Sequence, residues 1–371
     1  MPDDSPLLLL NPARRHDTTA TRPRSPAGAP IAFHRRLPGY APTRVVDAPA
    51  LAVDIGVSSL AIKDEAGRLG MPSFKILGAS WAVYRLLLRK LGHEPTWTDL
   101  DELRAAFAPL GTLALVAATD GNHGRAVAHM ARLLGYDAHI LVPAGTVAAR
   151  IDGIANEGAT VTVVDGTYDD AVRASAELAG DRRLVVSDTS WEGYTEVPTD
   201  VIDGYTTIFA ELDEQLAAAP DLVVVPMGVG ALTAAAVAHY ASIATVVAVE
   251  PLSAACGLRS AEAGRPVFVP GPHDSIMAGL NCGTVSPVAW PAVSAGVDAF
   301  VAVSDEAAEQ AMRDLASVGV VAGETGAASL AGLRAVAAAN VIPTRDARAL
   351  VLCTEGATDP SAYERIVGHA P

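Results

Sequence analysis

Cysteine is scarce in this chain, and positive charge is outnumbered by negative charge. The 371 residues include three cysteines, Cys256, Cys282 and Cys353, with no CxxC spacing. Such a set does not suggest a zinc site or any other metal site, and an odd, low count fits a reducing, cytoplasmic compartment. The chain has 27 Lys and Arg residues and 42 Asp and Glu residues, which gives a formal net charge of -15. A surface with that charge repels phosphate backbones, which argues against a nucleic acid partner.

The sequence also lacks a long, uninterrupted apolar run of the kind that spans a membrane. The best candidate, residues 222–251, is broken by one proline and two glycines, Pro226, Gly228 and Gly230. It predicts a strand, a glycine turn, a helix and a strand in a buried core, so we expect no membrane association. The run Leu7–Leu10 is too short for a secretory signal. We interpret residues 1–30 as a flexible leader.

Short apolar runs alternate with helical patterns along most of the chain. The first series predicts strands at 113–118, 139–143, 160–164 and 184–187, separated by helices at 124–134, 147–156 and 169–178. The second predicts helices at 200–216, 232–240, 305–317 and 325–339, with strands at 222–225, 245–249, 300–303 and 349–353. Such alternation is typical of parallel sheets covered on both faces. We therefore expect an α/β fold with two doubly wound, mostly parallel sheets, and a ligand beyond the strand ends.

One lysine has an unusual apolar setting. Lys75 lies between Phe74 and Ile76, at the start of the helix-like run Ala79–Leu88. A lysine that loses its water has a lowered pKa and becomes a nucleophile for carbonyl groups. The alternative is a lysine at a helix start whose amine extends into solvent.

A second motif follows the strand predicted at 113–118 and precedes a helix. The turn from Thr119 to Gly124 contains two glycines that allow a ligand close to the backbone, and Asn122 can donate to a phenolate oxygen. The alternative is an ordinary turn in which Asp120 caps the helix.

Two weaker motifs complete the set. Residues 226–232 form a glycine turn without the ending of a P-loop or the third glycine of a dinucleotide fingerprint, but its amides can bind one phosphate. Residues 350–356 form a strand with a small polar end, where Cys353 or Thr354 could face a heterocycle nitrogen. The alternative for each is a plain turn or strand end.

In this order, the four motifs resemble the fold-type-II pyridoxal-phosphate enzymes, a family that includes threonine and serine dehydratases, threonine synthase and tryptophan synthase β. The resemblance covers residues 31–360. A closer resemblance is to diaminopropionate ammonia-lyase, in the segments 63–65, 74–75, 118–125, 188–194, 276–283 and 354–356. The dehydratases usually have Ser at the position of Asp120 and lack the Asp-Thr-x-Trp-Glu-Gly-Tyr segment that begins at Asp188. Pro72-Ser73 departs from the family pattern.

The resemblance implies a role for each motif. Lys75, beside Phe74, would carry pyridoxal 5'-phosphate, and Asn122 would contact its ring oxygen. Cys353 or Thr354 would lie beside the ring nitrogen. The phosphate would bind amides of Gly228, Val229, Gly230, Ala231 and Leu232. The substrate would bind at Thr119, Asp120, Gly121, Asn122, His123 and Asp188. A large domain, 31–85 and 190–371, would hold the cofactor beside a small α/β domain, 86–189.

The implied reaction is α,β-elimination of ammonia from 2,3-diaminopropionate, giving pyruvate and two ammonia. Asp120 would act on the D isomer and Asp188 on the L isomer, although Asp188 could instead be a strand-end cap or an ion-pair partner. The alternatives are a serine or threonine dehydratase-like lyase, a β-replacement enzyme of a biosynthetic pathway, and a non-catalytic amino-acid sensor. We expect a homodimer. A bridge between Cys256 and Cys282 is an alternative to the free thiols that a reducing compartment favours.

Overall fold

The computed structural model describes residues 5–15, 24–119 and 121–371, which pack into two compact units. The seven-stranded unit comprises Pro42–Gly67 and Ile208–Pro371 together with the described residues 5–15. The four-stranded unit comprises Arg24–Ala41 and Arg68–Thr207. The limits of these units differ from those of the predicted large domain, 31–85 with 190–371, and small domain, 86–189. The predicted boundaries stay a prediction.

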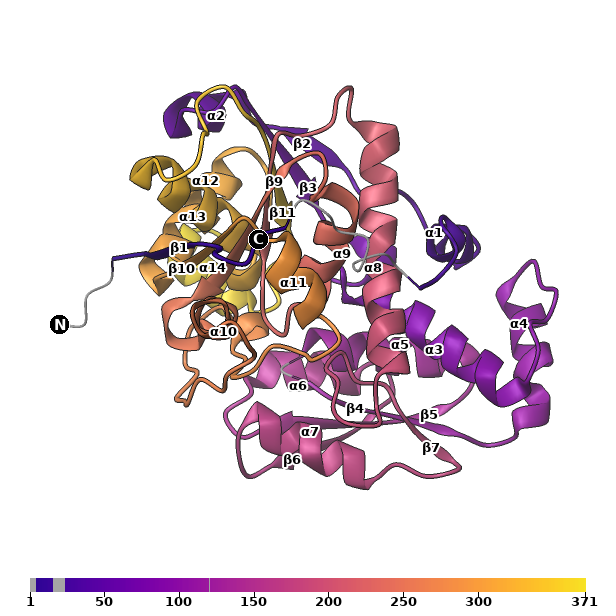
Figure 1. Cartoon of the computed structure of the whole chain (residues 1–371). Helices are drawn as coiled ribbons and strands as arrows, with labels where there is room; N and C mark the ends of the chain where they lie inside the picture. The colour runs from indigo at the N-terminus through magenta and orange to yellow at the C-terminus, as the bar shows by residue number, and fades with distance from the viewer. Residues whose placement is uncertain (1–4, 16–23, 120) are drawn as a thin grey trace. The chain divides into compact units, whose positions relative to one another are not determined.

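The seven-stranded unit is built on one sheet whose central strands are parallel (Figure 1). From edge to edge the strands are β1 (Leu7–Leu10), β10 (Ala299–Val303), β9 (Thr245–Pro251), β8 (Leu222–Pro226), β11 (Arg348–Cys353), β3 (Ser59–Asp64) and β2 (Val45–Asp47). Only the two edge strands of this sheet, β1 and β2, pair antiparallel with their neighbours. Every residue of β8 and β10 is buried, as expected of parallel strands that are covered by helices on both faces.

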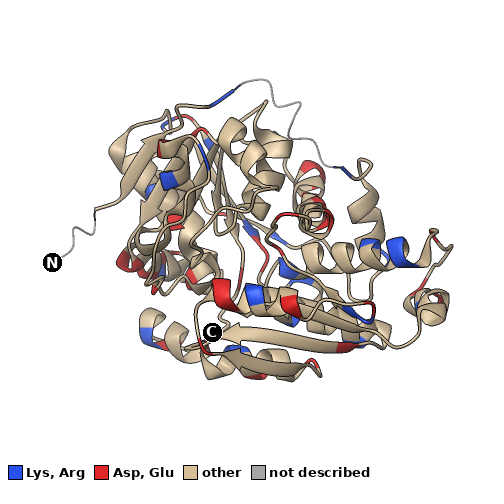
Figure 2. Cartoon of the chain, turned by 60° about the horizontal axis from the view of Figure 1, so that its bottom comes forward, with Lys and Arg blue, Asp and Glu red and all other residues tan. Residues whose placement is uncertain are grey.

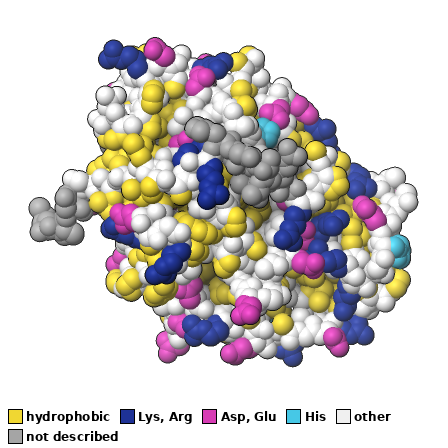
Figure 3. Space-filling model, in the orientation of Figure 1, with side chains coloured by type: hydrophobic (Ala, Val, Ile, Leu, Met, Phe, Trp, Pro, Cys, Tyr) yellow, Lys and Arg dark blue, Asp and Glu magenta, His cyan; other side chains and the backbone are white. Residues whose placement is uncertain are grey.

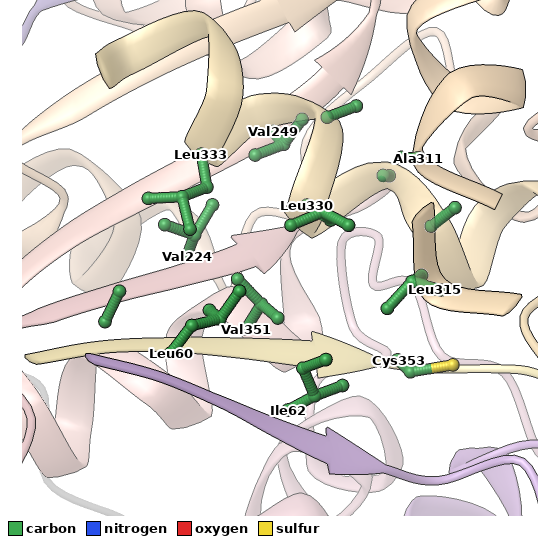
Figure 4. Packing of buried hydrophobic residues seen from close by; sticks show 14 of the residues in the cluster. Leu60, Ile62, Val224, Val249, Ala311, Leu315, Leu330, Leu333, Val351 and Cys353 are labelled. Carbon is green, nitrogen blue, oxygen red and sulfur yellow. The ribbon is translucent and has the colours of Figure 1, made fainter. Parts of the chain in front are cut away.

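The main hydrophobic core lies on one face of this sheet. Side chains that alternate along the strands, such as Leu60, Val224 and Val351, pack there against Leu330 and Leu333 (Figure 4). The helices of this face are α2 (Pro49–Ile55), α12 (Asp305–Ser317), α13 (Glu324–Ala339) and α14 (Pro360–Val367). The other described helices of the unit include α9 (Ala231–Tyr240), which packs on β8 and β9, α10 (Cys256–Ala263) and α11 (Trp290–Gly296).

The four-stranded unit has an entirely parallel sheet. Its strands are, in order, β6 (Thr160–Val164), β5 (Asp137–Pro143), β4 (Ala114–Ala118) and β7 (Arg183–Val185). Its helices include α1 (Ala29–His34), α3 (Lys75–Leu91), α4 (Leu100–Phe107), α5 (Asn122–Leu134), α6 (Ala148–Ala155) and α7 (Tyr168–Glu177), while α8 (Glu196–Gln215) contributes residues to both units. A small apolar cluster that includes Val116, Leu141 and Val185 packs against α7. Helix α5 packs on β4 and β5 and also contacts α3.

These two sheets confirm the predicted α/β fold class. Most strands and helices of both series lie within three residues of their predicted limits, and the helix predicted at 305–317 begins and ends as expected. The edge strands β1 and β2 and the strand β3 were not predicted.

The N-terminal segment corrects one expectation. A flexible leader over residues 1–30 is wrong for the described residues 5–15, because β1 pairs with β10 and the Asn11 amide donates to the carbonyls of Ser294 and Val297. Arg14 also forms an ion pair of 2.7 Å with Asp298. Residues 16–23 lie outside the described residues.

Charged side chains of both signs are interspersed along the described chain (Figure 2). On the face shown in Figure 3 they alternate with hydrophobic and neutral side chains. Among the described residues, no helix is both long enough and apolar enough to cross a membrane.

A buried charged network joins α8 to β3 inside the seven-stranded unit. The ammonium of Lys63 lies 2.7 Å from Glu211 and donates to the Thr43 carbonyl and to Gln215. Lys63 and Glu211 are both fully buried. A buried ion pair is stable only when the other hydrogen-bonding groups of its two side chains also have partners. The Thr43 carbonyl and Gln215 are such partners for the Lys63 ammonium.

Candidate active site

Lys75 is the first residue of α3, and it is paired with a buried carboxylate. Its Nζ lies 2.8 Å from Oδ2 of Asp188, and the two side chains are 17% and 6% exposed. The N-terminus of a helix is the positive end of its dipole, which disfavours a lysine at this place. The first turn of α3 contains no acidic residue that would offset this repulsion. The Asp188 carboxylate offsets that repulsion. A cation held at an unfavourable helix end by a distant residue indicates a functional position.

Asp188 follows β7 and is fixed at both carboxylate oxygens. Its Oδ1 accepts a hydrogen bond of 3.1 Å from the Tyr168 hydroxyl, and its Oδ2 faces Lys75. Burial acts to raise the pKa of Asp188, but the charges of Lys75 and His123 and the hydrogen bonds from Lys75 and Tyr168 outweigh it and lower the pKa. Because the two effects oppose each other, the proton affinity of Asp188 depends on whether Lys75 is charged.

The predicted glycine turn before α5 is shaped by a threonine. The Thr119 hydroxyl accepts from the backbone N–H of Gly121 at 2.9 Å and of Gly124 at 3.0 Å. Gly121 has φ +149°, and a Cβ at Gly124 would come within 2.3 Å of the Thr119 methyl group. Both positions therefore require glycine. Asp120, the predicted catalytic residue in this turn, lies outside the described residues.

His123 and Asn122 begin α5 directly after this turn. His123 is 2% exposed, and its Nε2 lies 2.8 Å from the Val186 carbonyl, two residues before Asp188. Asn122 is half-buried. The predicted contacts of both residues with ligands stay predictions, but the ring of His123 links α5 to the backbone that carries Asp188.

The second glycine turn, from Met227 to Gly230, connects β8 to α9 in the seven-stranded unit. Gly230 has φ +93°, and no side chain caps the N-terminus of α9. A Cβ at Gly228 would lie 3.1 Å from both the Cys282 Sγ and the Gly279 carbonyl. The turn therefore rests closely on the segment that contains Gly279 and Cys282. The uncapped start of a helix is suited to an anion.

The two candidates at the end of β11 have different surroundings. Cys353 belongs to the hydrophobic core shown in Figure 4, and its thiol donates to the Glu355 carbonyl at 3.5 Å. Burial raises the pKa of this thiol well above its usual range. Thr354 is 1% exposed, and its hydroxyl lies 3.5 Å from the Thr325 carbonyl. Strand β11 ends at Cys353, so Thr354 is the first residue after the strand.

All three cysteines are buried free thiols. Cys256, at the start of α10, donates to the Gly228 carbonyl at 3.7 Å. Cys282 lies beside Gly228 from the other segment. Cys256 and Cys282 therefore both lie against the same glycine turn.

Glu250, at the end of β9, was not predicted and is completely buried. Its carboxylate accepts from the backbone N–H of Gly257 at 2.6 Å and of Leu258 at 2.8 Å. Burial raises its pKa to about 7, although these two amides, Cys256 and the charge of Arg259 act to lower it. Glu250 thus joins β9 to the start of α10, close to the glycine turn.

Glu250 should make the stability of the protein dependent on pH. Its pKa is about 7 in the folded chain against an ordinary value of 4.5, so between these values the folded protein holds a proton that the unfolded chain has lost. The contribution of Glu250 to the free energy of unfolding therefore falls as pH rises through this window. The free energy of unfolding of Glu250→Gln minus that of the wild type should therefore increase by about 3 kcal/mol when the pH is raised from 4.5 to 8. Urea unfolding at both pH values measures this change.

The control for this comparison is Glu262→Gln, which alters an exposed glutamate of the same helix, α10. Its stability difference from the wild type should be nearly independent of pH. A constant difference for Glu250→Gln as well would contradict the raised pKa.

Comparison with known proteins identifies the family. Residues 36–355 match the family model of "Pyridoxal-phosphate dependent enzyme". The chain is 35% identical over 360 residues to the diaminopropionate ammonia-lyase of Escherichia coli K12, which covers 90% of this chain and 89% of the relative. It is 34% identical over 372 residues to that of Salmonella typhimurium, covering 91% and 90%. The crystal structure of the Escherichia coli enzyme in complex with D-serine superposes with a TM-score of 0.91 at 33% identity, over 98% and 97% of the two chains. The chain therefore belongs to the pyridoxal-phosphate-dependent enzymes and, within them, to the diaminopropionate ammonia-lyase family.

Proposed function

We propose that this protein eliminates ammonia from 2,3-diaminopropionate, giving pyruvate and two ammonia. The observation that carries the proposal is the buried pair of Lys75 and Asp188, 2.8 Å apart. An amine leaves a carbon atom only when it is protonated, and an anionic carboxylate stabilises the ammonium form. A hydroxyl group also needs a proton in order to leave, but because it is neutral beforehand a buried anion does not stabilise it in the same way.

The residues of the chain fit pyridoxal phosphate. By the family resemblance, Lys75 would supply the amine that holds it, with Phe74, which precedes Lys75, and Asn122, at the start of α5. In the seven-stranded unit Thr354 would serve its ring nitrogen, because the thiol of Cys353 packs in the hydrophobic core. The same resemblance assigns its phosphate to the uncapped turn formed by Gly228, Val229, Gly230, Ala231 and Leu232. When bound, the cofactor makes the α-proton of an amino acid removable by delocalising the resulting negative charge.

The acidic residues provide the proton chemistry. Asp188 exchanges protons with the L isomer, and its two hydrogen-bond partners, Lys75 and Tyr168, hold its carboxylate in place. Asp120 has the corresponding role for the D isomer. The turn that contains Thr119, Gly121 and His123 binds the substrate carboxylate. The stereochemical division follows the family resemblance.

We further propose a small amino acid as the ligand and a cytoplasmic homodimer as the working form. Three buried thiols without a disulfide support a reducing compartment. Large apolar side chains that remain exposed, including Ile243 and Phe268, support an association of two copies.

Turnover of D- and L-diaminopropionate and of D- and L-serine by the purified protein tests this function. We expect two ammonia per pyruvate from diaminopropionate and a turnover at least about 10-fold above that of serine, a difference of about 1.4 kcal/mol in activation free energy. A preference for serine would instead indicate a dehydratase. If a supplied thiol is added to the substrate and pyruvate is no longer formed, the protein is a β-replacement enzyme. Binding of an amino acid without turnover would indicate a sensor.

A further inference from the structure

The backbone that leads to Asp188 is held by side chains from outside its strand. The Tyr194 hydroxyl donates to the Val185 carbonyl at 2.8 Å and accepts from the Ser187 N–H at 3.1 Å. Between these two contacts, the Val186 carbonyl faces Nε2 of His123 at 2.8 Å. The main chain of three successive residues before Asp188 is therefore fixed.

Tyr194 is itself held by a closed turn. The backbones of Trp191 and Tyr194 exchange two hydrogen bonds, of 3.3 and 3.0 Å, and their rings stack 4.1 Å apart at 10°. Gly193 has φ +81°, which this turn requires. Both rings pack against the apolar cluster that contains Val116 and Val185. Residues 188–194 thus form a loop that is closed at its base by the Tyr194 hydroxyl.

The Tyr194 hydroxyl is both a donor and an acceptor to the backbone before Asp188. Burial raises its pKa well above its usual range, so it stays protonated and keeps donating at all working pH values. The same loop carries Asp188, whose carboxylate must reach Lys75 at 2.8 Å and Tyr168 at 3.1 Å. A shift of the Asp188 backbone by a fraction of an ångström would lengthen both contacts, because the short side chain of aspartate cannot compensate.

We propose that Tyr194 is a positioning residue that holds Asp188 against Lys75 and thereby sets the turnover of the L isomer. This inference rests on the proposed function, in which Asp188 acts on the L isomer and Asp120 on the D isomer. The hydrogen bonds of the Tyr194 hydroxyl are to the backbone of Val185 and Ser187, and it acts on Asp188 through them.

The test is Tyr194→Phe, which removes the hydroxyl and keeps the ring that stacks on Trp191. We expect kcat for L-diaminopropionate to fall about 10-fold or more, because misplacement of a reacting group is costly, while kcat for the D isomer stays within about 2-fold. The matched control is Tyr136→Phe, which removes a half-buried hydroxyl that donates to the Phe107 carbonyl at 3.3 Å in the same unit. Neither isomer should be affected by the control.

A second readout does not depend on turnover. With the cofactor bound, the Asp188 anion would favour the protonated state of the Lys75 nitrogen that holds it, and the absorbance of the holoenzyme would report this protonation. In Tyr194→Phe the absorbance should therefore titrate at a lower pH than in the wild type. The melting temperature of the apoenzyme reports separately on folding.

The outcomes separate the two proposals. An unchanged kcat for the L isomer together with an unchanged titration would overturn the role of Tyr194. Equal losses for both isomers with a lowered melting temperature would overturn it as well, because they indicate a structural role alone. If the wild type turns over neither isomer, the proposed function fails, and the titration still decides whether Tyr194 positions Asp188.

Discussion

The variant Lys75→Ala should lose its covalently held cofactor, and its turnover should fall by at least about 1,000-fold, since removal of a covalent catalyst costs at least this much. Lys75 is the amine that the family resemblance indicates and the proposed function requires; it has apolar neighbours, begins α3 and is paired with a buried carboxylate. The expected result is a preparation without the yellow band at about 410–420 nm of a lysine-bound cofactor. Mass spectrometry after borohydride reduction should find no cofactor attached to the chain.

The control for this variant is Lys90→Ala, which removes an exposed lysine near the other end of α3. It should keep its colour, its attached cofactor and its activity. A Lys75→Ala protein that stays yellow and retains a reducible cofactor bond would show that another amine binds the cofactor, and the proposed active site would then be wrong.

The variant Asp188→Asn should lose turnover of L-diaminopropionate by about 100- to 10,000-fold, as expected when a positioned acid–base group is removed. Asparagine has nearly the same shape but can neither accept a proton nor balance the charge of Lys75. The cofactor should stay attached, because Lys75 and the glycine turn before α9 are unchanged, but its yellow absorbance should titrate at a lower pH than in the wild type, because the anion beside Lys75 is gone. Turnover of the D isomer should be largely retained if Asp120 serves it. Steady-state kinetics with each isomer, together with the absorbance spectrum, measure these effects.

A suitable control for Asp188 is Asp200→Asn. Asp200 is another buried aspartate of the four-stranded unit, paired with Arg89 at 2.7 Å. Its replacement should lower stability without distinguishing the two isomers. Equal losses on both isomers in Asp188→Asn would refute the stereochemical division, and unchanged turnover of the L isomer would refute the catalytic role itself.

The parallel strands were predictable because each is a buried apolar run followed by a helical pattern. The strand β6 begins and ends where the sequence predicts it, and β8 and β9 differ from their predicted ends by at most two residues. The antiparallel edge strands β1 and β2 have only four and three residues, too few for the local pattern to distinguish them from loops. Strand β1 forms only because it pairs with β10, which lies hundreds of residues further along the chain. Strand β2 forms by pairing with β3.

The active-site residues were predictable only in part. Lys75 has a local signal, an amine between apolar neighbours, but its pairing with Asp188 joins residues 113 positions apart. The resemblance to a family indicated both residues without indicating their contact. Glu250 had no signal at all, because its importance comes from backbone amides that every residue has. Tyr194 lies in the segment 188–194 that carries the family resemblance, but nothing there indicated its contacts with backbone groups of Val185 and Ser187. The choice between Cys353 and Thr354 depended on the burial of Cys353 in the hydrophobic core.

The pairing of β1 with β10 has a consequence for biosynthesis. Leu10 can pair with Ala299 only after every residue between them has been synthesised. At 5–20 residues per second this takes about 15–60 s, during which the tetraleucine segment has no strand to pair with. All residues of the four-stranded unit have been translated by Thr207, so that unit can fold much earlier. The apolar segment Leu7–Leu10 therefore stays unpaired in the nascent chain until Ala299–Ala302 have been synthesised, and an unpaired apolar segment of this kind favours aggregation.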